Sequence, residues 1–236
     1  MIKVYGKSDT GLKRNHNEDY IGWSEEGGLA ILADGMGGHN AGEVASKIAV
    51  TTIQQQLLNS ALIDSKSEIK NAIDRANEAI NYKAKDSLVC AGMGTTVVVV
   101  LFNDSHISFG HVGDSRLYRL RDNVLEQLTS DHSLVQEMVD EGFMNQAEAR
   151  ESVSNNVITR ALGTDSEVQG EIQQQDISQG DRYLLCSDGL SDMIESTDIH
   201  NLMGEASMEV AVDKLIALAN VNGGSDNISV ILVEIV

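Results

Sequence analysis

Proline is absent from this 236-residue chain, and cysteine occurs only twice, at Cys90 and Cys186. Turns must therefore be built from Gly, Asn, Asp and Ser. Two cysteines are too few for a disulfide framework, and Cys186 lies in an apolar stretch typical of a core strand. The longest strongly apolar run, Val97 to Phe102, is far too short to cross a bilayer. We therefore expect neither a disulfide-stabilised fold nor membrane insertion.

Basic residues are also scarce, since 17 Lys and Arg face 36 Asp and Glu and leave a net charge of −19. Nucleic acids and anionic membranes are themselves negative, so this balance argues against either as a partner. The first residues, Met1 to Gly6, show no basic segment followed by a long apolar stretch, which favours a cytoplasmic location. The length and the 42% hydrophobic content predict one domain over residues 1–236 with a sizeable core.

Four carboxylates stand at the ends of apolar runs, namely Asp34, Asp114, Asp188 and Asp226. A single Asp-Gly pair is more often only a turn signal. Four acids at strand ends, far apart in the sequence, suggest instead one shared cation site. Magnesium and manganese prefer oxygen ligands, and no matching set of Cys or His residues points to zinc.

Hydrophobic periodicity predicts an α+β fold in which antiparallel strands form two sheets packed face to face, with helices outside. Ser65 with Glu68 looks like a capping box, and the connection through Asp122 and Asn123 suits a hairpin. Strands are expected at residues 2–8, 20–23, 28–33, 95–102, 106–112, 116–120, 124–128, 183–187 and 227–236. Helices are expected at residues 41–57, 65–80, 133–141, 146–151, 197–203 and 207–220. The stretch around 133–156 interrupts the strands and is interpreted as a lid-like excursion.

Eight short motifs occur in an order typical of one family. They are Arg14 to Asp19, Asp34-Gly35-Met36-Gly37-Gly38-His39, Gly92-Met93-Gly94-Thr95-Thr96, Gly110-His111-Val112-Gly113-Asp114-Ser115-Arg116, Ser130-Asp131-His132-Ser133, Ile158-Thr159-Arg160-Ala161-Leu162-Gly163, Ser187-Asp188-Gly189-Leu190 and Asp226-Asn227-Ile228-Ser229. Through them the chain resembles the bacterial branch of the metal-dependent type 2C protein phosphatases over nearly its whole length. The resemblance implies a four-layer α-β-β-α sandwich, which agrees with the periodicity.

The resemblance also implies a site for two core Mn or Mg ions. Asp34 would bridge both ions. One ion would be coordinated by the backbone carbonyl of Gly35 and, directly or through water, by Glu18. Asp188 and Asp226 would hold the other.

Further roles follow from the same resemblance. Asp114, together with Asp188, would bind a weaker third ion. Arg14 would hold the phosphate of the substrate, and Asp19 and His39 would lie in the outer shell.

The activity implied is hydrolysis of phosphoserine and phosphothreonine in proteins by a metal-bridging hydroxide, without a covalent intermediate. Metal coordination can bring the pKa of water from 15.7 to near neutrality, which makes hydroxide available at working pH. The resemblance further implies that the substrate is a protein phosphorylated by a bacterial Ser/Thr kinase, and we expect the chain to be a monomer.

Two positions depart from the family pattern. Met36 stands where eukaryotic relatives carry a histidine that is a candidate general acid, so the leaving-group proton must come from another donor, such as a metal-bound water or His39. Ser152-Val153 stands where bacterial relatives often carry His-Pro, which affects lid geometry but not the metal site.

Two alternatives remain open: a binding module of the same fold without turnover, and a hydrolase of small phosphomonoesters. Retention of Asp34, Asp188 and Asp226 speaks against the first.

Overall fold

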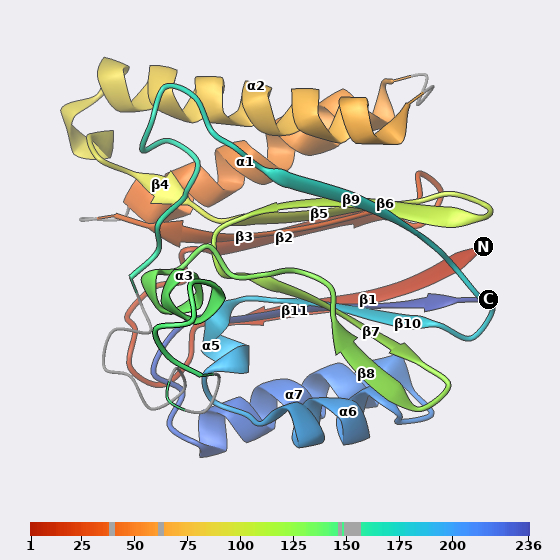
Figure 1. Ribbon diagram of the computed structural model, residues 1–236. Helices are drawn as coiled ribbons and strands as arrows, with labels where there is room; N and C mark the ends of the chain where they lie inside the picture. Colours follow the sequence, from red (N-terminus) through yellow and green to blue (C-terminus); the bar gives the residue numbers. More distant parts are fainter. Residues whose placement is uncertain (38–40, 61–63, 146–147, 149–156) are drawn as a thin grey trace.

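The computed structural model describes residues 1–37, 41–60, 64–145, 148 and 157–236. Four layers are visible in Figure 1, in which two β-sheets lie face to face and each is covered on its outer side by helices. The predicted α-β-β-α sandwich is therefore confirmed. The two chain ends lie together at the right of the view, and the helices α3 and α5 lie at the opposite end.

The first sheet is antiparallel throughout, and its central strands are buried on both faces. Its main strands, in spatial order, are β2 (Asp19–Ser24), β3 (Leu29–Met36), β5 (Val97–Phe102), β6 (His106–Val112) and β9 (Glu171–Asp176), and the short β4 (Gly94–Thr95) pairs with the end of β3.

The second sheet is also antiparallel, and it contains both ends of the chain. In spatial order its strands are β1 (Ile2–Asp9), β11 (Ile228–Ile235), β10 (Arg182–Cys186), β7 (Arg116–Arg121) and β8 (Val124–Gln127). The tight turn between β7 and β8 carries two residues with positive φ, Asp122 at 49° and Asn123 at 62°, as a two-residue hairpin of this type requires.

The helices pack with their apolar faces on the sheets. The first sheet is covered by α1 (Ala41–Leu58) and α2 (Ser65–Asp86), and the second by α5 (Asp188–Ser191), α6 (Ser196–Met203) and α7 (Met208–Val221). Shorter connecting elements are η1 (Leu88–Cys90) and α3 (Leu134–Asp140).

Successive residues of β3 belong to two different hydrophobic cores, because side chains of a strand alternate between its faces. Ile31 packs toward α1 and α2, whereas Ala30 and Leu32 pack between the sheets. Between the sheets, the rings of Phe102 and Tyr183 meet edge to face with centroids 5.5 Å apart. In the described part of the chain, none of the helices combines the length and the apolar character that spanning a membrane would take.

Some boundaries differ from the sequence prediction. The cap of α2 is Asp64, which accepts a hydrogen bond from Lys66 N, so Ser65 is the first helical residue and not the cap. The predicted strand 95–102 is two strands, because residues 94–95 pair with the end of β3 and Thr96 donates its N–H to Asp34 O at 2.9 Å. Strand β9 was not predicted. Apart from residue 148, the predicted helix 146–151 lies outside the described residues, as does part of the predicted lid.

Candidate metal centre

Asp34 is presented by the end of β3, where the apolar core of the strand gives way to polar surroundings. Its neighbour across the strand pair is Asp19 of β2. The threonines of the β4–β5 break fix the Asp34 backbone, since Thr96 Oγ1 accepts from its N–H at 3.0 Å and Thr95 Oγ1 donates to its carbonyl at 2.7 Å. Two carboxylates therefore project from one edge of the first sheet on a rigid backbone.

Asp188 enters the same region from the second sheet, as the first residue of the short helix α5 after β10. The preceding Ser187 donates its hydroxyl to Asp19 Oδ2 at 2.9 Å and accepts from Ser229 N at 2.9 Å, which joins the two sheets at this end. At the next position only glycine fits, because a Cβ on Gly189 would lie 2.0 Å from Asn227 O. The carboxylate of Asp188 is thus held by backbone packing and not by a flexible loop.

Asp226 lies just before β11 and forms an ion pair with Arg14, whose Nη2 is 2.6 Å from Asp226 Oδ2. The adjacent Asn227 anchors the N-terminal loop, accepting from Glu18 N at 2.8 Å and donating to His16 O at 3.0 Å. The Glu18 carboxylate contacts His16 Nε2 at 3.2 Å. This network brings Arg14 and Glu18 beside the acids of both sheets.

Asp114 stands at the turn from β6 to β7, where the chain passes from the first sheet to the second. Gly113 before it has φ of +100°, a conformation that glycine adopts without strain. Only 7% of Asp114 is exposed, and its Oδ1 is among the buried side-chain atoms without a hydrogen-bond partner.

Four ionised carboxylates this close together are electrostatically unfavourable in a buried cluster without a cation. Burial raises the pKa of Asp19 to about 6 and that of Asp114 to about 7, with a contribution from Asp131 in the second case. Burial, followed by repulsion from neighbouring acids, raises the pKa values of Asp34 and Asp188 well above the ordinary value. Buried like charges raise pKa values in this way unless a cation compensates them.

Several buried carboxylate oxygens of the cluster have no hydrogen-bond partner in the described part of the chain, and this indicates the kind of ion that the cluster fits. Among the described residues, Asp19, Asp114 and Asp188 each keep a buried Oδ1 with no hydrogen-bond partner. A buried polar atom without a partner is costly, and hard divalent cations take carboxylate oxygens as ligands. The donor set is made of oxygens, so the residues present fit magnesium or manganese.

Of the residues predicted from sequence, the structure brings together Arg14 with Asp226, and Asp34 with Asp114 and Asp188. Gly35 follows Asp34 and donates its N–H to Glu18 O at 3.1 Å. His39 and Ser152-Val153 lie outside the described residues. The ligand roles themselves stay predictions.

Sequence reasoning missed Asp192, which adds its charge to Asp188 from the next turn of the chain. Its N–H donates to Asp188 O at 2.8 Å. The signal was present as the i, i+4 spacing of two acids, which places both on one helix face. Burial raises the pKa of Asp192 as well.

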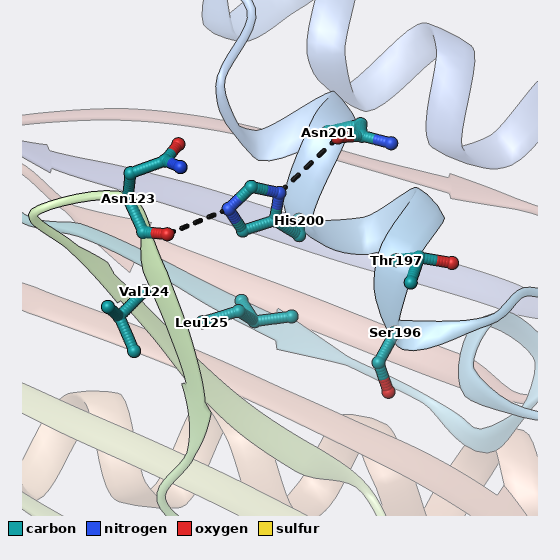
Figure 2. Close-up of a pocket in the computed structure, with 7 residues that line it drawn as sticks. All are labelled: Asn123, Val124, Leu125, Ser196, Thr197, His200 and Asn201. Carbon is teal, nitrogen blue, oxygen red and sulfur yellow. Dashed lines mark hydrogen bonds between the residues drawn. The ribbon is translucent and has the colours of Figure 1, made fainter.

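An open cavity of about 470 Å³ lies elsewhere, between the β7–β8 hairpin and α6 (Figure 2). It is lined by Asn123, Val124, Leu125, Ser196, Thr197, His200 and Asn201. Its only ionisable side chain is His200, whose Nε2 donates to Asn123 O at 2.9 Å. With no carboxylate in its lining, this cavity is not where the acids of the chain converge.

A cluster of carboxylate oxygens at one end of such a sandwich fits a divalent-cation site of the kind that metal-dependent hydrolases use. A family model for protein phosphatase 2C matches residues 12–223. The serine/threonine phosphatase Stp of Listeria welshimeri is 37% identical over 97% of this chain and 94% of its own length.

Solved structures agree with the sequence relatives. The Mycobacterium tuberculosis serine/threonine phosphatase PstP superposes with a TM-score of 0.95 at 36% identity, over 99% of this chain and 98% of that one. A structure of the PstP catalytic domain in complex with two manganese ions superposes with a TM-score of 0.91 at 36% identity, over 99% and 97% of the two chains. The chain therefore belongs to the bacterial branch of the protein phosphatase 2C family and is a protein serine/threonine phosphatase.

Proposed function

We propose that this chain hydrolyses phosphoserine and phosphothreonine in proteins with the help of two or three Mn or Mg ions held by the acidic cluster. The observation that carries the proposal is the convergence of carboxylates from both sheets, three of which keep an unpartnered buried oxygen. The manganese ions of the PstP relative support the choice of metal.

In this proposal Asp34 is a ligand shared by the two core ions, with Glu18 and the Gly35 carbonyl on one side. Asp188 and Asp226 serve the other ion. When bound, the cations would supply an activated water and neutralise the phosphate charge. Before they bind, the cluster repels a phosphate dianion.

Arg14 would orient the substrate phosphate. Its guanidinium is half exposed and already pairs with Asp226, and that hydrogen bond raises the pKa of Arg14 further. A guanidinium can form two parallel hydrogen bonds to a phosphate, which a point charge cannot. In-line positioning and charge neutralisation are the main demands of phosphoryl transfer.

A third ion at Asp114 and Asp188, and residues 1–236 as one catalytic domain with a lid near 133–156, belong to the same proposal. We also propose that the enzyme acts as a monomer in the cytoplasm on the products of a Ser/Thr kinase. The two free, buried cysteines suit a reducing compartment.

The decisive experiment measures phosphate release from a phosphothreonine peptide with Mn²⁺ and with chelator, for the wild type and for Asp34→Asn. Loss of a charged ligand shared by two ions should reduce kcat by at least about 10³-fold. The matched control is Asp104→Asn, at an exposed aspartate in the β5–β6 turn, which should retain wild-type kcat. Near-normal turnover by Asp34→Asn, or turnover indifferent to chelator, would refute the proposal.

A further inference from the structure

Two motif histidines, His111 and His132, have no part in the proposed mechanism, yet they stack beside Asp114. Their ring centroids lie 4.6 Å apart with 21° between the ring planes. Both are buried, and burial lowers the pKa of each, that of His132 to about 4. They are therefore neutral rings at physiological pH, with one protonated and one unprotonated nitrogen each.

With Glu171, these histidines form a group whose ligand atoms all lie within 4.8 Å of one another, which raises the question of a transition metal. An ion bound by both rings would have to lie in the plane of each, and nearly parallel stacked planes do not meet between the rings. Arg160 Nη1 also lies 3.3 Å from His132 Nε2, which places a positive charge where the ion would be. The group is therefore a poor cation site.

Two hydrogen bonds of His132 are instead with Gly113, the residue that precedes Asp114. Its ring Nδ1 accepts a hydrogen bond from Gly113 N at 3.1 Å, and its own backbone N–H donates to Gly113 O at 3.0 Å. His132 thus holds both polar groups of the residue that immediately precedes Asp114. The ring of His132 holds the Val112–Gly113 peptide group and its backbone N–H holds the Gly113–Asp114 peptide group, on either side of a residue at φ +100°.

The tautomer of His132 is fixed by the same geometry. Since Nδ1 accepts from Gly113, a neutral ring carries its proton on Nε2, which faces Glu171 Oε1 at 3.3 Å. The contact of Arg160 Nη1 with Nε2 is then no hydrogen bond, because both nitrogens are donors. Arg160 pairs with that same carboxylate oxygen at 3.8 Å. Glu171 therefore favours the one tautomer that can hold Gly113.

We propose that His132 is a positioning residue for the third-ion site: its ring holds the Val112–Gly113 peptide group so that the buried Asp114 carboxylate faces Asp188. This inference rests on the proposed role of Asp114 as a ligand of a third ion. Outer partners that orient a ligand commonly change metal affinity by about 10- to 100-fold when removed.

Two substitutions of similar size separate this role from packing. The side-chain oxygen of His132→Asn stands close to the place of Nδ1 and can still accept from Gly113 N. In His132→Gln the terminal amide stands near the place of Nε2, so it can reach Glu171 but not Gly113. A packing role would treat the two variants alike.

The experiment titrates chelator-stripped protein with Mn²⁺ and follows free Mn²⁺ by electron paramagnetic resonance, with thermal denaturation to show that each variant is folded. We expect His132→Gln to weaken the weakest class of Mn²⁺ sites about tenfold and His132→Asn to weaken it less than about threefold, with the tight sites unchanged in both. His106→Gln, at the far end of β6, is the matched control and should bind as wild type.

The same titration is then repeated with Asp114→Asn alone and with Asp114→Asn combined with His132→Gln. In the Asp114→Asn background we expect no further loss of Mn²⁺ affinity from His132→Gln, because the group that it positions is already gone. Folded His132→Gln with a wild-type weak site, or additive losses in the double variant, would overturn the inference while leaving the proposed function intact. If Asp114→Asn itself left every class of sites unchanged, the third-ion assignment would fail and this inference with it.

Discussion

At the scale of single residues, the buried carboxyl group of Asp114 should make the free energy of unfolding depend on pH. Burial raises its pKa to about 7 in the folded chain, against an ordinary value of 3.8. A raised pKa in the folded state means that folding favours the protonated form. The free energy of unfolding of the cation-free protein therefore loses this contribution as pH rises from about 4 to about 7.

Asp114→Asn should remove that pH dependence. In chelator at pH 7 or above, we expect the variant to be more stable than the wild type by about 1–4 kcal/mol, because each pKa unit is worth about 1.4 kcal/mol. At pH 4 the two should differ little, since both side chains are then neutral. Urea unfolding at several pH values measures the difference, and a wild type favoured at pH 7 without cations would contradict the prediction.

Unlike the buried Asp114, Arg14 has a half-exposed side chain, and its ion pair with Asp226 contributes little to the free energy of unfolding. Arg14→Lys keeps the charge but loses the planar fork. We expect KM for a phosphothreonine peptide to rise about tenfold with a smaller change in kcat, while Tm moves by less than about 2 °C. Arg75→Lys on the exposed face of α2 is the control, and an unchanged KM for Arg14→Lys would remove Arg14 from phosphate binding.

At the scale of elements, the site depends on how closely α5 approaches β11. A Cβ at Gly189 would lie 2.0 Å from Asn227 O, so Gly189→Ala must push α5, and Asp188 with it, away from the start of β11. We expect a loss of about 2–4 kcal/mol in stability and at least a tenfold loss of activity.

Gly204→Ala is the matched control for this substitution. Gly204 has an ordinary helical φ of −77°, and its added Cβ would lie 3.3 Å from the nearest atom. Urea unfolding and phosphopeptide turnover should both be close to wild type. Equal effects of the two substitutions would show that α5 tolerates displacement.

Elements with strong periodicity were predictable from sequence, and those defined by their partners were not. The apolar run Leu29 to Ala33, whose residues are divided between two cores, is a local pattern, and so the strand 28–33 was found. Strand β9 has the sequence Glu-Ile-Gln-Gln-Gln-Asp, whose strand conformation follows from pairing with β6 at a sheet edge. No local signal marks such a polar edge strand.

The same distinction applies to the site. The acids that end apolar runs, such as Asp34 and Asp188, were visible because strand and turn signals are local. That Asn227 would anchor Glu18, or that His132 would hold Gly113, depends on side chains separated by many residues along the chain. Those contacts exist only after the sheets are assembled.

At the scale of the whole molecule, the acids of the candidate site come from both sheets. Asp34 belongs to the first sheet, Asp188 and Asp226 lie next to the ends of β10 and β11 in the second sheet, and Asp114 lies in the turn that joins the sheets. The chain also carries a net charge of −19, so it repels itself before any cation binds. A cation held by residues next to both sheets would therefore oppose their separation, which global unfolding includes.

Mn²⁺ should accordingly raise the Tm of the whole chain. A ligand present at about 100 times its Kd adds about 2.7 kcal/mol, which corresponds to roughly 5–10 °C for a chain of this size. The shift should fall to less than about half in Asp34→Asn, which lacks the carboxylate proposed to be shared by the two core ions, and should remain in Asp104→Asn. NaCl at equal ionic strength controls for screening of the net charge. A shift that is the same in Asp34→Asn, or is reproduced by NaCl, would mean that Mn²⁺ acts on the surface charge and does not connect the two sheets.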